Sequence, residues 1–252
     1  MKKKIFTLII FSLFILSVGI AQDKSCIKST CLKGDVGYFS LSIGPSIPMG
    51  NFADNNIKNA NSGFAKTGSK VGLNAGFKVL ENINLGVSLY YSVNSYDVSS
   101  LTQKLATDYP GTTWNTSGRN WDIYGGMIGF IYSYPFKNKF VGDFKFQSGV
   151  MQSSIPEMVV TSNNNLKITE AKKSASSFVY LLSIGGHYPL GRLFDVTGNL
   201  EYLSSSPTFS NISRLYNVPT FNPPGIVTSS STTSYNQNIS MLSLNFGFRV
   251  KF

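Results

Sequence analysis

Apolar residues alternate with polar or small residues along eight segments of the chain, and this two-residue period constrains the fold more than any other feature. Successive side chains of a β-strand point to opposite faces, so each segment predicts a strand with one apolar and one polar face. In the clearest segment, residues 242–252, the apolar set is Leu242, Leu244, Phe246, Phe248, Val250 and Phe252. The period therefore predicts an all-β chain.

The other seven segments show the same alternation, and we expect strands at 39–44, 72–79, 83–92, 124–134, 140–150, 177–188 and 194–202. None of the residues on their apolar faces is charged. Lys or Arg on the lipid-facing side of a membrane barrel costs about 2–4 kcal/mol at the bilayer midplane. The uncharged faces are therefore expected to contact lipid, with the polar faces lining a lumen.

Short and long connections alternate strictly between these segments. The short ones are 81–82, 135–139 and 189–192, and the long ones are 48–70, 95–120, 152–173 and 204–234. Short turns on one side and long loops on the other are typical of outer-membrane barrels. The pattern predicts an eight-stranded antiparallel up-and-down transmembrane β-barrel, with both termini on the side of the short turns.

A soluble β-sandwich or lipocalin-like barrel would also alternate, with its apolar face inward. Charged residues make up only 13% of this chain, compared with about 25% in soluble domains. The polar faces contain mainly Gly, Ser and Asn, which suits a narrow lumen better than bulk water. Composition therefore favours the membrane barrel, and the scattered charges behind the net +10 do not predict a nucleic-acid partner.

The N-terminus predicts export. Lys2, Lys3 and Lys4 precede an apolar run, residues 5–20, that is shorter than the roughly 20 residues of a membrane span and leads to a small-residue cleavage site at Ala21. We expect a signal peptide at 1–21, a short periplasmic leader at 22–36 and the barrel at 37–252. Cys26 and Cys31 are predicted to form a disulfide in the leader, since a metal site would need two further ligands.

The chain resembles the small outer-membrane β-barrel proteins of Gram-negative bacteria, the OmpA- and OmpX-like barrels of the porin family, in its signal peptide, in its first strand (37–45, GYFSLSIGP) with Gly50-Asn51-Phe52 after it, and in its terminal strand. The resemblance implies an outer-membrane location with periplasmic termini and extracellular long loops. It also implies contact with outer-membrane lipid and lipopolysaccharide, and with the assembly machinery during biogenesis. The terminal strand resembles the signal that this machinery recognises, here Leu244, Phe246, Phe248, Val250 and Phe252.

Charged residues on the inward faces are the main candidates for a functional site. An eight-stranded barrel is just wide enough for side chains to fill it, so these charges are expected to pair, for example Asp143 or Glu201 with Arg249 or Lys145. A narrow polar pore is the alternative. The predicted network comprises Lys78, Asp143, Lys145, His187, Asp195, Glu201, Arg249 and Lys251.

No catalytic residues, metal ligands or cofactors are predicted. His187 is the one histidine of the chain, and it lies at the short-turn end of its strand without a neighbouring nucleophile motif. The long loops are the remaining candidates for recognition, through Trp114 with Asp108, Pro110, Gly111, Thr112 and Thr113, and through Tyr216 with Pro219, Phe221, Pro223, Pro224 and Gly225.

The sequence therefore predicts a non-enzymatic outer-membrane barrel with a structural or surface-interaction role through its long loops. A small porin for polar solutes is the first alternative, and an accessory barrel of an envelope secretion system is the second. No external ligand can be named from the sequence.

Overall fold

The computed structural model describes residues 36–59, 61–221 and 224–252. The predicted signal peptide and the predicted Cys26–Cys31 disulfide lie outside these residues. Gly37–Lys251 form one compact unit, and Val36 outside it donates a backbone hydrogen bond of 2.7 Å to the carbonyl oxygen of Phe252. No helix in the described ranges is long and apolar enough to cross a bilayer.

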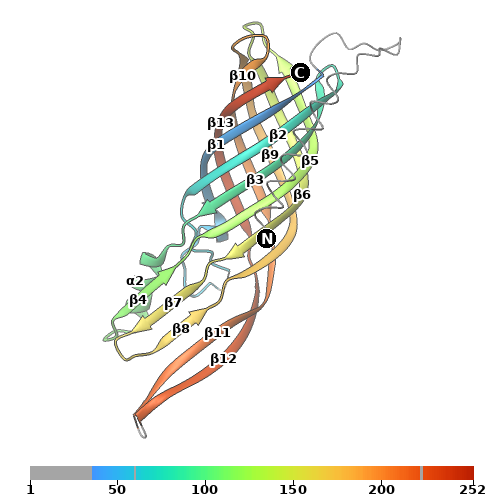
Figure 1. Cartoon of the computed structure of the whole chain (residues 1–252). Helices are drawn as coiled ribbons and strands as arrows, with labels where there is room; N and C mark the ends of the chain where they lie inside the picture. Colours follow the sequence, from blue (N-terminus) through green and yellow to red (C-terminus); the bar gives the residue numbers. More distant parts are fainter. Residues whose placement is uncertain (1–35, 60, 222–223) are drawn as a thin grey trace. The chain divides into compact units, whose positions relative to one another are not determined.

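Eight antiparallel strands close into a barrel, as the alternation predicts (Figure 1). Each strand pairs with its neighbours along the chain, which is the up-and-down arrangement, and the last strand closes the barrel against the first. The strands are β1 (Gly37–Met49), β2 (Gly68–Leu80), β3 (Ile83–Asn94), β5 (Trp121–Pro135), β6 (Val141–Ile155), β9 (Lys173–Pro189), β10 (Phe194–Ser205) and β13 (Ile239–Lys251).

Strand register places the apolar faces on the outside. Leu41 lies opposite Leu73, and Leu73 lies opposite Leu89, so three strands present leucines in one row. Residues of the expected outward faces are exposed, for example Ile43, Phe130 and Phe178, while Ser40 and Ser42 on the opposite face of β1 are buried. Because the exposed apolar residues within each strand share one parity, apart from Leu80 at the end of β2, a one-residue register slip of a strand would turn its apolar set inward.

The long connections are not irregular loops, which corrects the expectation from sequence. They contain the short 3-10 helix η1 (Gly50–Phe52), the helix α2 (Val98–Asp108) and a second sheet of five strands in the order β12-β11-β8-β7-β4. Figure 1 shows α2 and this sheet gathered beyond the lower end of the barrel. The strands are β4 (Trp114–Gly118), β7 (Met158–Ser162), β8 (Lys167–Glu170), β11 (Thr208–Phe221) and β12 (Pro224–Asn236).

We call the five-stranded sheet together with α2 the platform. We call the two ends of the barrel the turn end, where the short connections lie, and the platform end. The platform strands are connected closely to the barrel strands, because only two residues separate β10 from β11 and only two separate β12 from β13. The chain therefore builds one barrel and one ordered extension at its platform end.

Candidate functional site

Glu201 is the centre of one buried ion cluster inside the barrel. Its carboxylate lies 2.7 Å from Lys70 Nζ and 3.5 Å from Lys145 Nζ, and all three side chains are almost completely buried. Asn245 donates a further hydrogen bond to Glu201 at 2.8 Å. One buried carboxylate thus faces two ammonium groups, which meets the requirement that buried charges be paired.

A second cluster lies nearer the turn end, around Asp143. Arg249 Nη2 donates to Asp143 Oδ2 at 2.8 Å, and the same oxygen lies 3.0 Å from His187 Nδ1. Asp195 lies 3.8 Å from His187 Nε2 and 3.0 Å from Lys251 Nζ. The cluster therefore brings together five of the residues that the sequence proposes.

Lys78 and Lys70 differ from the sequence prediction. Lys78 makes none of the ion pairs within the described part of the chain and lies opposite Asn84 at the turn end of β2. The sequence pattern places Lys70 in a connection, whereas it belongs to β2 and pairs with Glu201. The alternation of Lys70, Gly72 and Asn74 is the signal that extends the strand back to Lys70.

The interior near the platform end is apolar, which corrects the expectation of a polar lumen throughout. Phe52 of η1 packs edge-on against Trp121 with ring centroids 5.3 Å apart, and Trp121 contacts Phe209 of β11 at 6.1 Å. The indole of Trp121 donates to the backbone oxygen of Gly63 at 2.9 Å. The buried cluster also contains Tyr90, Ile123, Met127, Met151, Ile155, Val179, Leu181, Leu203, Ile212, Ile239 and Met241.

These inward apolar residues and the ion clusters fill the barrel in successive layers. A cavity of about 10 Å³ lies between them, lined among others by Lys70, Tyr90, Met127 and Glu201. Such a volume holds about one water molecule. The interior is therefore packed at this level rather than open. No group of three or more potential metal ligands occurs among the described residues.

The platform carries a much larger hollow, and strand register places its lining residues on one face of the sheet. Met158 pairs with Glu170, and Glu170 pairs with Arg214, so these three residues form one row across three strands. Val160, Ile168 and Tyr216 form another row in the same way. Because side chains alternate between faces, both rows point to the same side.

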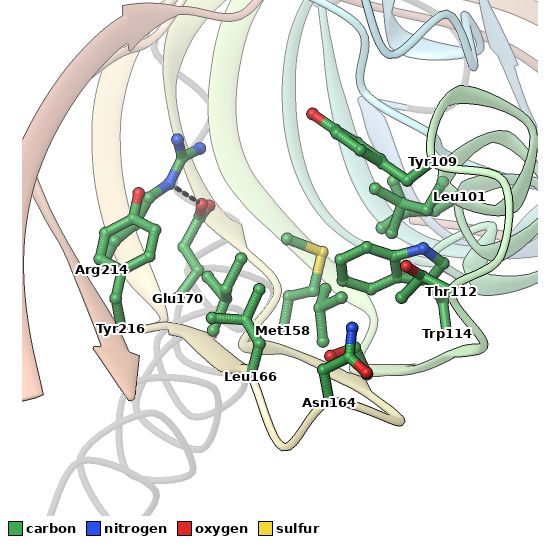
Figure 2. Close-up of a pocket in the computed structure, with 14 residues that line it drawn as sticks. Leu101, Tyr109, Thr112, Trp114, Met158, Asn164, Leu166, Glu170, Arg214 and Tyr216 are labelled. Carbon is green, nitrogen blue, oxygen red and sulfur yellow. Dashed lines mark hydrogen bonds and ion pairs between the residues drawn. The ribbon is translucent and has the colours of Figure 1, made fainter. Parts of the chain in front are cut away.

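Helix α2 covers only part of this face, which leaves a pocket of about 530 Å³ (Figure 2). Leu101 is buried against Val160 in a small apolar cluster, and Trp114 and Met158 are packed against this cluster but only half-buried. The ring of Tyr109 lies 5.8 Å from the ring of Trp114. The full lining is Leu101, Leu105, Tyr109, Thr112, Trp114, Met158, Val160, Ser162, Asn164, Leu166, Ile168, Glu170, Arg214 and Tyr216.

One ion pair lies in the otherwise largely apolar wall of the pocket. Arg214 Nε donates to Glu170 Oε2 at 2.6 Å, and the side chain of Arg214 is 37% exposed whereas that of Glu170 is 8% exposed. Partial burial disfavours the charged guanidinium, but the Glu170 carboxylate outweighs that effect and raises the pKa of Arg214 above its ordinary value. The pocket therefore presents a permanent cation, while its counter-ion is withdrawn from the surface.

The sequence identifies part of this pocket. Of the residues proposed for recognition, Trp114, Thr112 and Tyr216 line it, whereas Pro110 and Gly111 do not. The proposed segment 219–225 lies at the tip of the β11–β12 hairpin, and its residues 222–223 are outside the described residues. Sequence reasoning misses Met158, Glu170 and Arg214, because their grouping arises only from strand pairing within the platform.

No protein-family model matches the chain, and no curated protein sequence matches it. Several solved structures are similar. A major outer membrane protein from Thermus thermophilus is 14% identical, with 86% of this chain and 99% of that chain covered and a TM-score of 0.48. Neisserial surface protein A is 12% identical, with 86% and 97% covered and a TM-score of 0.46. The attachment invasion locus protein Ail of Yersinia pestis is 12% identical, with 86% and 99% covered and a TM-score of 0.42.

Proposed function

We propose that this chain is a non-enzymatic, non-conducting outer-membrane barrel that holds the platform outside the membrane for a surface-interaction role. The observation that carries the proposal is the contrast between the barrel interior, which is packed with side chains, and the platform, which is ordered and presents a pocket. A barrel of this kind anchors and displays rather than transports.

The outer surface of the barrel supports a membrane location. Large apolar side chains are exposed on every barrel strand, among them Ile43, Phe77, Phe130, Phe178 and Phe246. Soluble monomers rarely expose contiguous apolar patches larger than a few hundred Å², so a belt around a whole barrel requires an apolar environment. Outer-membrane lipid and lipopolysaccharide are the proposed surroundings of this belt.

The orientation follows from the connections. Short turns join β2 to β3, β5 to β6 and β9 to β10, and the platform lies at the other end. Outer-membrane barrels carry short turns on the periplasmic side and longer segments outside. We therefore place both ends of the barrel chain in the periplasm and the platform at the cell surface.

The packed interior favours anchoring over the small-porin alternative. Passage along the barrel axis would have to displace both the Glu201 cluster and the apolar cluster around Trp121. Removing one partner of a buried ion pair typically costs about 3–5 kcal/mol, so a transient opening of both layers is strongly disfavoured.

Planar-bilayer recordings test the proposal. The full chain, refolded into lipid and shown to be folded by heat-modifiable migration on a gel, is expected to insert and to give a flat current trace. Surface labelling of a cysteine introduced at Ser230, an exposed residue of β12, should occur in intact cells. Discrete conductance steps from folded protein would contradict the anchoring role and favour the small-porin alternative. If Ser230→Cys were not labelled in intact cells, the proposed orientation would be wrong.

A further inference from the structure

We propose that the platform pocket binds a small amphiphile with an apolar body and a single carboxylate, held by the apolar wall and by Arg214. The inference rests on the proposed function, because it names the ligand class that a surface-displayed platform would take. Its basis is the shape of the pocket and the arrangement of one exposed cation in an otherwise largely apolar wall.

The size of the pocket matches a small molecule rather than a protein surface. Ligand pockets typically measure roughly 300–1,000 Å³ and combine an apolar lining with a few polar groups, and this pocket measures about 530 Å³. Its walls come from four strands and from α2, which lie far apart in the sequence. A site assembled from several long connections is a property of the folded platform and not of one loop.

The apolar wall is incompletely buried, although it belongs to a core-like cluster. Leu105, Trp114, Met158 and Ile168 all pack against the buried Leu101 and Val160, yet each retains exposed surface. In Figure 2 the six-membered ring of Trp114 lies beside Met158 on one side of the hollow, and Arg214 and Glu170 lie on the other. Tyr109 is 58% exposed, so its ring is available as the rim of the site. An apolar ligand body would complete the burial of these side chains.

The polar side of the pocket selects an anion. The ion pair with Glu170 uses Nε of Arg214, and the guanidinium is also hydrogen-bonded to the side chain of Tyr216, which leaves further N–H donors on its two terminal nitrogens. Those terminal nitrogens match the two oxygens of a carboxylate in a bidentate arrangement. A cationic ligand is disfavoured, because the one carboxylate of the wall, Glu170, is buried and already bonded to Arg214.

An apolar carboxylate can be a fatty acid or an aromatic acid, and the pocket chemistry is the same for both. Isothermal titration calorimetry on the full chain in lipid nanodiscs, at neutral pH, distinguishes them with octanoate and phenylbutyrate. Octanamide is the matched neutral analogue of octanoate, and empty nanodiscs measure partition into lipid. We expect saturable one-site binding of at least one of the two acids. We expect octanamide to bind at least about tenfold more weakly than octanoate.

Two variants locate the binding. Arg214→Gln removes the cation and is expected to weaken binding of the acid at least about tenfold. Arg119→Gln is the matched control, since Arg119 also pairs with a glutamate, Glu157 at 3.6 Å, but is 77% exposed and does not line the pocket. It should bind as the unmodified chain does.

The outcomes separate the two proposals. Heats equal to those of empty nanodiscs for both acids, or equal affinity for octanoate and octanamide, would overturn the ligand assignment, and neither result depends on whether a variant folds. Equal binding by Arg214→Gln and the unmodified chain would do the same. If binding fails while the chain inserts and gives a flat current trace, the anchor function stands and only the ligand is wrong.

Discussion

Glu201 shows how single residues hold the interior of this barrel together. It faces both Lys70 and Lys145, so Glu201→Gln would leave two buried ammonium groups without their carboxylate. We expect a loss of about 3–5 kcal/mol in the free energy of unfolding, measured by urea titration of the lipid-refolded chain. Asp122→Asn is the control, because Asp122 pairs with Lys172 in an exposed position and should change stability by no more than about 1 kcal/mol. Equal losses would contradict the cluster's role.

Gly76 permits the stacking of Tyr38 and Arg249. The guanidinium of Arg249 lies 3.8 Å from the centre of the Tyr38 ring, and a Cβ at Gly76 would lie 2.3 Å from Tyr38 Cε1. Gly76→Ala should therefore displace the ring and destabilise the barrel by about 1–3 kcal/mol in the same urea titration. Gly191→Ala is the control, since nothing lies within 4 Å of its added Cβ. Indistinguishable midpoints would show that the ring moves without cost.

Helix α2 depends on its N-cap at the scale of one element. The Asp97 carboxylate accepts a hydrogen bond from the backbone N–H of Ser100 at 3.1 Å and pairs with Lys66 at 3.1 Å. Asp97→Ala should destabilise the helix by about 0.5–2 kcal/mol, detected as faster hydrogen exchange of the α2 amides. Asp108→Ala at the other end should not accelerate exchange, because a negative charge there opposes the helix dipole. Unchanged exchange in Asp97→Ala would exclude the cap.

The pH dependence of α2 follows from the same carboxylate. Burial opposes its ionisation, but hydrogen bonds from Ser100 and Ser99 and the contact with Lys66 outweigh it and lower the pKa of Asp97 well below its ordinary value. A depressed folded-state pKa stabilises the helix above the unfolded value, near about pH 4, and that contribution is lost as pH falls through the folded pKa. The protection of the α2 amides, measured relative to their intrinsic exchange rate at each pH, should fall only below about pH 4, and Asp97→Ala should abolish this dependence.

The elements differ in how far the sequence reveals them. The barrel strands are predictable because each presents one apolar face on the outside of the barrel, as in β13 with Phe246 and Phe248. Strand β12 (Pro224–Asn236) has no such face, because most of its described side chains are exposed, so its Ser- and Thr-rich sequence resembles a loop. The inward apolar residues of the barrel can be identified from the sequence. Their packing against Phe52 and Phe209 cannot, because it depends on contacts between segments that are distant in the chain.

For the molecule as a whole, the ion clusters in the barrel and the platform pocket differ in how far the sequence predicts them. The ion clusters can be anticipated from parity, since Arg249, Asp143 and Glu201 all fall on inward positions. Their partners lie across the lumen on strands that do not pair with each other, since Arg249 of β13 bonds to Asp143 of β6 and Glu201 of β10 bonds to Lys70 of β2. Predicting the platform pocket also requires the order of strands in the platform sheet, because its lining depends on β8 pairing with both β7 and β11. Predictability therefore falls as the site draws on more strands.

The proposed assembly signal can be separated from barrel stability. Strand β13 pairs with β1 and with β10 along residues Ile239–Lys251, so deletion of Phe252 removes its hydrogen bond with Val36 and its other end contacts but leaves every paired residue of both ladders in place. We expect the shortened chain to refold into lipid vesicles with an unchanged urea midpoint, and to lose most of its yield in the outer membrane of cells. Phe136→Ser, which alters an exposed aromatic residue after β5, is the control and should assemble normally. Normal cellular assembly without Phe252 would remove its role in recognition, and a lowered urea midpoint would show that it stabilises the barrel instead.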